Sequence, residues 1–269
     1  MKTILVTGGA GFIGSNFVRY WYENYPDDKI IVLDTLNYAG RFQNIPAMIH
    51  KDADRFEFFL GSVLSVEIVN TLVERSDIIV HFAAETHVTR SIYESRHFFE
   101  VDVLGTHTIA NAVLKYCDTV ERFIHVSTSE VYGTAITRPM TEDHPLNSCS
   151  PYASAKSGAD RLVYSYYYTY GVPAVILRPF NQYGPYQHLE KVIPRFITSA
   201  LRDIPLTVHG NGYAMRDWLY VDDTCGRIAA AIKAPVDKVA CYPRPEMDPC
   251  IGGNRTHLAV SVVMKLSGY

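Results

Sequence analysis

The segment Thr3–Gly14, which reads TILVTGGAGFIG, decides the fold of this chain. Its apolar start predicts a buried strand, and the glycines that follow lead directly into a helical pattern. Glycines at this spacing permit a tight turn, a close approach of the backbone to a pyrophosphate, and close packing of helix on strand. The free N–H groups at the start of the helix favour an anion. The sequence therefore predicts a dinucleotide-binding loop that uses Gly8, Gly11, Phe12, Ile13 and Gly14.

An acidic residue indicates which dinucleotide binds. Asp34 ends the second predicted strand, about 20 residues after the loop, where a carboxylate accepts hydrogen bonds from the ribose hydroxyls. The same negative charge repels a 2′-phosphate, so we expect NAD rather than NADP.

Short β-branched runs alternate with helical patterns through the first two thirds of the chain. Continuous apolar runs are typical of a parallel sheet buried on both faces, and the alternation implies βαβ crossovers. The predicted class is α/β, a doubly wound Rossmann parallel sheet with a small C-terminal substrate-binding lobe. The expected strands are Thr3–Thr7, Ile30–Asp34, Phe56–Leu60, Ile78–Phe82, Arg122–Ser127 and Ala174–Pro179; the expected helices are Phe12–Tyr25, Val66–Arg75, His97–Tyr116 and Tyr152–Tyr170.

The pattern changes after Phe180, where turn signals appear at Gly184-Pro185 and at residues 209–212. A helix is expected over Val192–Arg202, a strand over Asp217–Val221, and a further helix over Val221–Lys233. We therefore expect residues 1–180 to form the NAD-binding Rossmann domain, with residues 215–235 returning to it. Residues 181–214 and 236–269 are expected to form the substrate-binding lobe.

Composition narrows the class of partner. A formal charge of −3 is close to balance, so the sequence favours neither a nucleic-acid nor a membrane partner. The five cysteines are scattered, form no CxxC pair and are odd in number, so we expect no disulfide framework and no metal site. The first strand leaves no room for a signal peptide, and no apolar run approaches about 18 residues. We expect a cytoplasmic protein.

Two chemistry-bearing segments lie in the middle of the chain. Thr128, Ser129 and Glu130 follow a predicted strand, at the end where open α/β sheets bind ligands. Tyr152 and Lys156 lie four positions apart on one face of the next helix, for which Ser150-Pro151 is the expected start. An ammonium there can favour the phenolate of a tyrosine, whose pKa is ordinarily about 10. Such a phenol can take a proton from a sugar alcohol beside a bound dinucleotide.

These motifs resemble those of the extended short-chain dehydrogenase/reductases that act on nucleotide sugars, most closely the dTDP-glucose 4,6-dehydratases. The resemblance covers nearly the whole chain. The matching stretches are GGAGFIGSNFVRY from Gly8, LDTLNYAG from Leu33, HFAAETHV from His81, Ser127–Gly133, Tyr152–Lys156, RPFNQYGPY from Arg178, EKVIP from Glu190, RDWLYV from Arg216 and IGGN from Ile251.

The resemblance implies a mechanism and a set of site residues. Tyr152, assisted by Lys156, takes the C4 hydroxyl proton while hydride passes to NAD; Glu130 removes the C5 proton; water leaves C6, and hydride returns to C6. Thr128 hydrogen-bonds the C4 oxygen, and Ser129 occupies the position of the acid. The implied cofactor contacts also include Asn37 and Ala83, and the implied substrate contacts are Thr86, Asn181, Lys191, Arg216 and Asn254. A homodimer through helices near residues 97–116 and 152–170 is also expected.

Some positions depart from the family pattern. Ser129 stands where the dehydratases have Asp, and a serine does not readily donate a proton to departing hydroxide. Asp102 stands where Asn is common, Ser62 where an Asp is usual, Thr89 where an acid is usual, and Gln182 where a second Asn is usual. The family continues for several dozen residues past its Ile-Gly-Gly-Asn region, so we expect a lobe truncated at the C-terminus.

Three functions therefore stay open at this stage. The first is an NAD-dependent nucleotide-sugar 4,6-dehydratase. The second is a 4-epimerase that uses the same tyrosine and NAD without elimination. The third is a diverged NAD-binding protein without catalysis.

Overall fold

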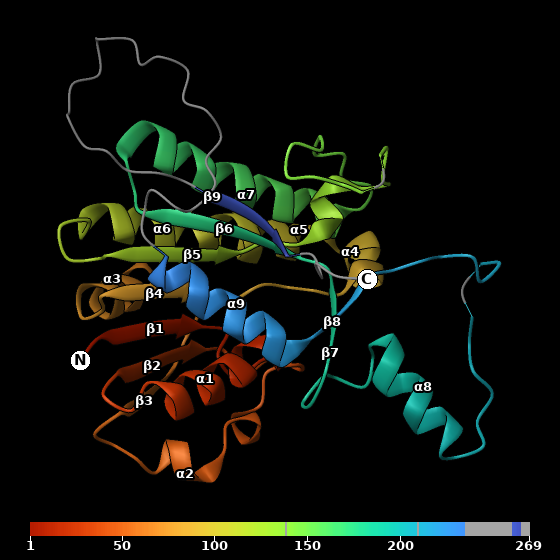
Figure 1. The fold of residues 1–269 in the computed structure, drawn as a ribbon, viewed down its shortest axis with the longest axis horizontal. Coiled ribbons are helices and arrows are strands. Elements are labelled where there is room, and N and C mark those ends of the chain that lie inside the picture. The colour runs from red at the N-terminus through yellow and green to blue at the C-terminus, as the bar shows by residue number, and fades with distance from the viewer. Residues whose placement is uncertain (138, 209, 235–259, 265–269) are drawn as a thin grey trace.

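One seven-stranded parallel sheet organises the molecule (Figure 1). The computed structural model describes residues 1–137, 139–208, 210–234 and 260–264. The strand order is β3-β2-β1-β4-β5-β6-β9, and every neighbouring pair is parallel. The strands are β1 (Thr3–Thr7), β2 (Lys29–Asp34), β3 (Phe56–Leu60), β4 (Ile78–His81), β5 (Arg122–Val126), β6 (Ala174–Pro179) and β9 (Val260–Met264). The predicted doubly wound Rossmann sheet is confirmed, and its order reverses between β1 and β4.

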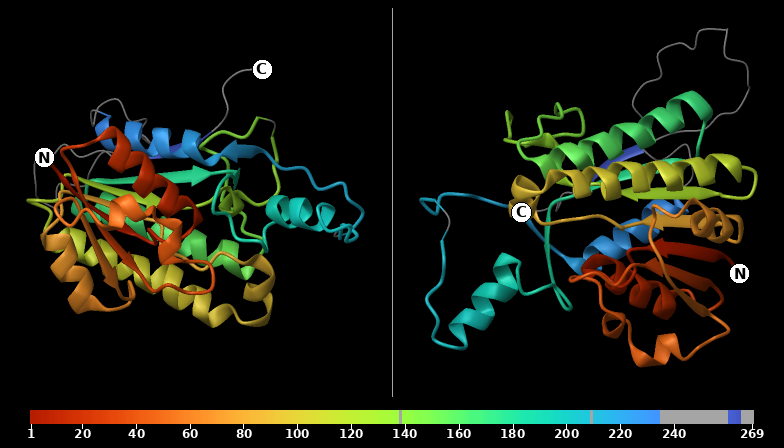
Figure 2. Two further views of the ribbon diagram at one scale, coloured as in Figure 1. Left: turned by 90° about the horizontal axis from the view of Figure 1, so that it is seen from below. Right: turned by 180° about the vertical axis from the view of Figure 1, so that it is seen from behind.

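Helices cover both faces of the sheet, as Figure 2 shows. Successive residues of one strand enter different cores: Ile4 and Val6 pack with one set of helices, and Leu5 packs with the other. The first set is α1 (Phe12–Asn24) and α9 (Val221–Lys233); the second is α3 (Val66–Glu74), α6 (Gly105–Lys115) and α7 (Pro151–Tyr170). Burial on both faces explains why the strands are apolar without alternation.

The helix predicted over residues 97–116 is interrupted. It consists of α5 (Ser95–Phe98), a π-helical turn η2 (Phe99–Leu104) and α6. A π-helical turn inserts an extra residue and rotates the next turns of the helix, and such turns occur frequently at functional sites. Periodicity alone did not reveal it, because one inserted residue barely changes an apolar pattern.

The predicted start of α7 is confirmed. The Ser150 hydroxyl accepts a hydrogen bond from the Ala153 N–H, Pro151 occupies the first turn, and Gly171 ends the helix in a left-handed conformation. The backbone N–H of Tyr152 donates to the hydroxyl of Ser91, which belongs to α4 (Val88–Tyr93). The position of Tyr152 is therefore fixed by both helices.

Short elements complete the described chain. They are α2 (Ala47–His50), α8 (Val192–Ala200), β7 (Asn181–Tyr183), β8 (Trp218–Tyr220) and the 3₁₀ turns η1 (Phe42–Asn44) and η3 (Ser129–Tyr132). Strands β7 and β8 pair with each other in parallel and form a separate two-stranded sheet.

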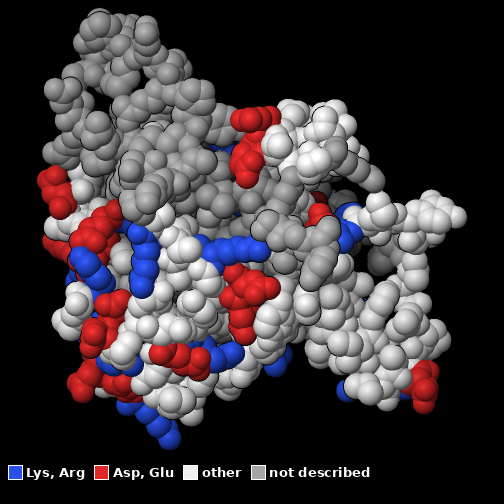
Figure 3. All heavy atoms as spheres, in the orientation of Figure 1, with Lys and Arg blue, Asp and Glu red and all other residues white. Residues whose placement is uncertain are grey.

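Residues 192–208 and 210–217 form an arm that projects from the main body (Figures 1 and 2), and Figure 3 shows few charged side chains on it. No residue of α8 is buried. Helix α9 packs on α1. One part of the expected division is wrong: residues 236–269 were assigned wholly to the lobe, yet β9 lies in the main sheet beside β6. A sheet can be extended at its edge by an apolar strand from any part of the sequence, so the position of β9 along the chain did not reveal its place in the sheet.

A buried ion pair joins α7 to the sheet. Asp160 on α7 accepts two hydrogen bonds from the guanidinium of Arg178 on β6, both 2.8 Å long, and Arg178 also donates to the hydroxyl of Tyr132. Both charged side chains are at most 1% exposed. The cationic partners lower the pKa of Asp160 although burial acts in the opposite direction.

No helix of the described residues is long and apolar enough to cross a membrane.

We predict that Asp160→Asn lowers the free energy of unfolding by about 3–5 kcal/mol, because it leaves a buried guanidinium without its counter-charge. Since the pKa of Asp160 is lowered on folding, the contribution of this carboxylate is present at neutral pH and is lost as the pH falls through the folded-state pKa. Denaturant unfolding at pH 7 and at a series of pH values from 4 down to 2 measures both effects. Arg96→Ala, which breaks the exposed pair with Glu100, is the control and should leave the free energy of unfolding close to that of the wild type. An equal loss in the two variants would contradict the prediction.

Candidate active site

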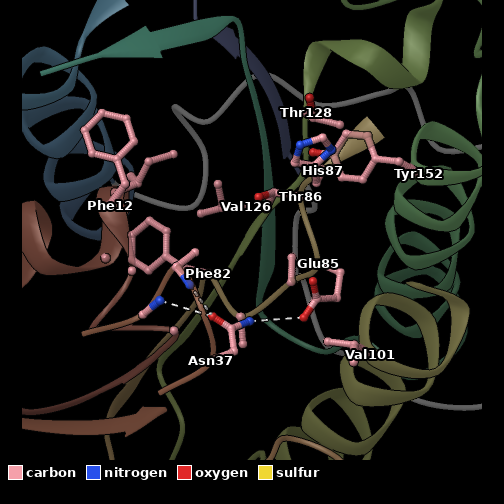
Figure 4. Close-up of a pocket in the computed structure, with 18 of the residues that line it drawn as sticks. Phe12, Asn37, Phe82, Glu85, Thr86, His87, Val101, Val126, Thr128 and Tyr152 are labelled. Atoms are coloured by element: carbon pink, nitrogen blue, oxygen red, sulfur yellow. Dashed lines mark hydrogen bonds between the residues drawn. The ribbon is translucent and has the colours of Figure 1, made fainter. Parts of the chain in front are cut away.

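A cavity of about 690 Å³ lies at the carboxyl ends of the central strands, where the strand order reverses (Figure 4). Open parallel sheets bind ligands at this position. Most of the predicted site residues line it: Gly8, Gly11, Phe12, Ile13, Gly14, Asp34, Asn37, Ala83, Thr86, Thr128, Glu130, Tyr152, Lys156, Asn181 and Lys191. The lining of this one cavity therefore comes from segments that lie far apart in the sequence.

The glycine loop forms one end of this cavity. Gly8 has a φ of +72°, and a Cβ built there would lie 2.6 Å from the backbone nitrogen of Ala83. A Cβ at Gly14 would lie 2.2 Å from the carbonyl oxygen of Gly8. Helix α1 begins after Gly11 without a side-chain cap. No capping side chain therefore occupies the first N–H groups of the helix, at the end where the glycine loop lines the cavity. The geometry of this cradle fits a pyrophosphate; its use as the cofactor loop stays a prediction.

Asp34 is held in place by backbone groups. Its Oδ2 accepts from the Ala10 N–H at 2.9 Å and its Oδ1 from the Leu36 N–H at 2.8 Å. Burial raises the pKa of Asp34, and these backbone bonds oppose that shift. Each carboxylate oxygen retains a further lone pair, so the group can also accept from ribose hydroxyls. Asn37 accepts from the Ala39 and Gly40 N–H groups and donates to Glu85 at 3.1 Å, as Figure 4 shows.

The second predicted cluster lies at the other end of the cavity. The Tyr152 side chain points from α7 toward Thr128 in Figure 4. Thr128 caps the short turn η3 by accepting from the Glu130 N–H at 3.2 Å, and Glu130 also lines the cavity. The ammonium of Lys156 donates to the carbonyl of Val126 at 2.9 Å, at the end of β5. The phenol of Tyr152, the hydroxyl of Thr128 and the carboxylate of Glu130 therefore border the same cavity as the buried ammonium of Lys156.

The charge state of this cluster differs from the expectation. Burial raises the pKa of Tyr152, the charges of Asp102 and Glu130 raise it further, and only the Thr128 hydroxyl lowers it. Burial also lowers the pKa of Lys156, while Asp102 and Asp160 act in the opposite direction. In the protein alone the pKa of Tyr152 is therefore raised rather than lowered, because burial disfavours the phenolate.

Three predicted site residues are not brought to the cavity by the described part of the chain. Ser129 is buried and does not line it. Arg216 lies in the exposed arm, where its guanidinium donates to the carbonyl of Met215. Asn254 lies outside the described residues. Arg216 is exposed although Trp218, two residues later, lines the cavity, and local sequence cannot reveal which of two such neighbours turns inward.

A charged network that sequence reasoning missed borders the cavity. Glu190 accepts a hydrogen bond from the Tyr38 hydroxyl at 3.2 Å and lies within 3.7 Å of the nitrogens of His87, Arg90 and Lys191. The ammonium of Lys191 donates to the carbonyl of Thr86 at 3.0 Å. The clue in the sequence was that Tyr38 and Glu190 occur in the family-like stretches LNYAG and EKVIP. The network ties the segment before α8 to the loop after β4.

Gln182 also lines the cavity with an unusual environment. Its side chain is buried, and neither amide atom has a hydrogen-bond partner among the described residues. A buried amide without partners is costly unless a ligand or water satisfies it. Gln182 therefore adds unsatisfied polar groups to a wall that otherwise includes Phe180 and Trp218.

Among the described residues there is no cluster of three or more His, Cys, Asp or Glu side chains that could hold a metal ion.

Comparison with known proteins agrees with this geometry. Residues 5–242 match the model of a protein family described as GDP-mannose 4,6 dehydratase. The chain belongs to this family. It is 44% identical over 230 residues to the low-salt glycan biosynthesis protein Agl12 of Haloferax volcanii, a match that covers 86% of this chain and 73% of that protein. It is 42% identical over 237 residues to a dTDP-glucose 4,6-dehydratase of an Actinoplanes species, covering 86% and 72%.

A solved structure is similar throughout the matched region. The dTDP-glucose 4,6-dehydratase DesIV of Streptomyces venezuelae, solved with NAD and TYD bound, superposes with a TM-score of 0.81 at 43% identity. The match covers 86% of this chain and 72% of that chain. The resemblance to nucleotide-sugar dehydratases that the motifs indicated is confirmed.

We predict that Gly8→Ala weakens dinucleotide binding by at least tenfold. The new methyl group would collide with the backbone at Ala83, and alanine would have to adopt the positive φ of this position, which L-residues rarely do. Isothermal titration with NAD measures the affinity. Gly226→Ala is the matched control: it lies inside α9, where its nearest neighbour is 3.6 Å away, and alanine favours a helix. Unchanged affinity in Gly8→Ala, or an equal loss in both variants, would refute the assignment of the loop.

Proposed function

We propose that this protein is an NAD-dependent nucleotide-sugar 4,6-dehydratase. The observation that carries the proposal is that a phenol, a carboxylate and a glycine-rich dinucleotide loop border one cavity at the switch point of the sheet. Oxidation at C4, elimination of water across C5 and C6, and reduction at C6 convert the sugar into its 4-keto-6-deoxy form. Membership of the dehydratase family and similarity to enzymes of that name support this reaction.

The residues that would hold NAD follow the length of the cavity. Asp34 accepts from the ribose, the turn at Gly8, Gly11 and Gly14 receives the pyrophosphate, and Tyr152 with Lys156 borders the nicotinamide end. Phe12, Ile13, Asn37 and Ala83 complete the proposed contacts. When bound, NAD supplies the acceptor for the hydride removed at C4 and the donor of the hydride returned at C6, so the reaction has no net redox change.

The oxidation needs a group that removes the C4 hydroxyl proton. Tyr152 performs this step, and Thr128 donates a hydrogen bond to the same oxygen. Because burial raises the pKa of Tyr152 in the protein alone, the phenolate must be favoured by positive charge that enters the cavity with the ligands and by Lys156. The ammonium of Lys156 also fixes the end of β5 through the Val126 carbonyl.

The elimination needs a base at C5 and proton delivery at C6. A ketone at C4 acidifies the adjacent C5 proton, and Glu130 removes it. We assign Ser129 to the acid position that the resemblance implies. Because Ser129 is buried and does not line the cavity, we propose that a water carries the proton to the leaving oxygen.

The substrate is proposed to be a nucleoside diphosphate sugar, with dTDP-glucose as the first compound to test. Thr86, Asn181 and Lys191 line the cavity and supply hydroxyl, amide and ammonium groups suited to a sugar diphosphate. Arg216 and Asn254 are retained as proposed diphosphate contacts; Arg216 lies two residues before Trp218, which lines the cavity. Residues 1–180 with 215–235 are proposed as the NAD-binding unit, and residues 181–214 as the start of the substrate lobe.

The decisive experiment is incubation of the protein and NAD with dTDP-glucose, UDP-glucose and GDP-mannose, followed by mass spectrometry and NMR. The expected product is a 4-keto-6-deoxy sugar nucleotide whose mass is lower by one water. A product with inverted C4 and unchanged mass would instead establish a 4-epimerase. Bound NAD without turnover of any of these compounds would establish a diverged binding protein.

Glu130→Gln tests the division of labour within the reaction. Its amide cannot remove the C5 proton, so we expect formation of product to fall by at least 100-fold while transient NADH absorbance persists. Tyr152→Phe is the matched comparison, because it should abolish the NADH signal as well. A Glu130→Gln variant that forms product at the native rate would overturn the assignment of the base.

A homodimer is proposed through the neighbouring segments 97–116 and 152–170. These helices pack side by side and carry large exposed side chains: Phe99, Leu104 and Tyr168 are each at least 42% exposed. We expect Leu104→Glu and Tyr168→Glu together to convert a dimer to a monomer in light scattering, because they would place charges in an apolar interface. Tyr213→Glu, on the exposed arm, is the control and should leave the mass unchanged. A monomeric wild-type protein would refute the dimer.

A further inference from the structure

A buried carboxylate lies behind the cavity, outside the set of residues assigned above. Asp102 belongs to the π-helical turn η2 and is 1% exposed. Its Oδ1 accepts from the backbone N–H of Glu85 at 2.7 Å. Its Oδ2 has no hydrogen-bond partner among the described residues. A half-satisfied buried carboxylate is costly, and such groups occur where their charge serves a function.

The position of Asp102 is fixed by a chain of buried hydrogen bonds. The hydroxyl of Thr106 donates to the Asp102 carbonyl at 2.6 Å, so it must accept from the Nε2 of His81, 3.0 Å away. The Nδ1 of His81 then accepts from the hydroxyl of Thr7 at 2.6 Å. Burial lowers the pKa of His81 to about 3, so this ring stays neutral. The chain connects the end of β1 to the backbone of η2 at Asp102.

The charged groups around Asp102 come from each neighbouring element. Helix α7 supplies Lys156 and Tyr152, each coupled electrostatically to Asp102. The loop after β4 supplies Glu85, whose negative charge opposes ionisation of Asp102. Helix α5 supplies His97, whose Nε2 lies 3.5 Å from Glu85. Glu100 on η2 itself faces outward and pairs with Arg96. Lys156 supplies the positive charge that favours ionisation of Asp102.

We propose that Asp102 is a positioning residue that sets the proton affinity of the Tyr152–Lys156 pair and holds the loop after β4 against α7. Its carboxyl oxygen fixes the backbone at Glu85, in the loop that carries Ala83 and Thr86 into the cavity. Its charge favours protonation of both Tyr152 and Lys156. The catalytic consequence rests on the proposed function, whereas the charge itself can be tested without turnover.

The pKa of Asp102 supports this assignment. Burial raises it to about 7, although the Lys156 charge and the Glu85 N–H act in the opposite direction. The group therefore changes charge in the pH range in which enzymes work. In an unfolded chain the carboxyl of Asp releases its proton near pH 4. Between these two values the folded protein binds a proton that the unfolded chain has lost, so this residue makes stability fall as the pH rises from about 4 to about 7.

The first experiment compares Asp102→Asn with wild type by thermal unfolding from pH 4.5 to 8.5 without ligands. Asparagine keeps the acceptor for the Glu85 N–H and removes the charge. We expect the unfolding temperature of the variant relative to wild type to rise by several degrees between about pH 5 and pH 7, and then to stay constant. Glu100→Gln is the matched control from the same turn and should show no such rise. A difference that does not depend on pH would overturn the proposed titration.

If Asp102→Asn does not fold, the wild-type protein still decides the question. Carbon-13 NMR of protein labelled at the aspartate carboxyl carbons should show one carboxyl that titrates near pH 7. A spectrum in which every aspartate titrates below about pH 5 would refute the proposal.

The second experiment measures kcat/KM against pH for the same variants with whichever sugar nucleotide is turned over. Loss of the Asp102 charge lowers the pKa of Tyr152, so the profile of Asp102→Asn should move to lower pH by about one unit. The profile of Glu100→Gln should match wild type. A profile of Asp102→Asn that does not move, with the stability effect present, would remove the catalytic role alone; absence of turnover in wild type would instead count against the proposed function.

Discussion

The close approach of two backbone segments at the switch point of the sheet is the constraint on which the site depends. Gly8 lies so near Ala83 that any side chain at position 8 would collide with the main chain. This contact joins the loop after β1 to the loop after β4, the two strands between which the order of the sheet reverses. Because the chain leaves β1 and β4 toward opposite faces of the sheet, the two loops open a crevice, and the start of α1 faces into it.

Burial governs the chemistry at the other end of the crevice. Tyr152, Lys156 and Asp102 are all removed from water, and desolvation is the largest cause of the pKa shift of each. Desolvation favours the neutral form of every group, so their charges depend on one another more than on solvent. A cofactor or substrate that brings charge into this space therefore changes the proton affinity of the whole cluster.

Local sequence patterns predicted the parts of the fold that are governed by local rules. The glycine loop, the cap at Ser150, and the strands that end at Thr7 and Asp34 follow from turn chemistry, capping and apolar runs. The π-helical turn at Phe99–Leu104 did not follow, because its extra residue is accommodated by packing against α7. The place of β9 beside β6 did not follow either, since strand order depends on pairing between distant segments.

The sequence by itself determined the class of fold, the dinucleotide loop and the identity of the catalytic candidates, because each rests on residue types at fixed spacing. Tertiary structure alone decided which of them meet. It brought Thr128, Glu130, Tyr152 and Asn181 to one cavity, left Arg216 on a projecting arm, and added Glu190 and Asp102 to the surroundings. The physical reason is that burial and the pKa of a side chain are properties of its neighbours in space, and for this site those neighbours come from segments scattered between residues 8 and 218.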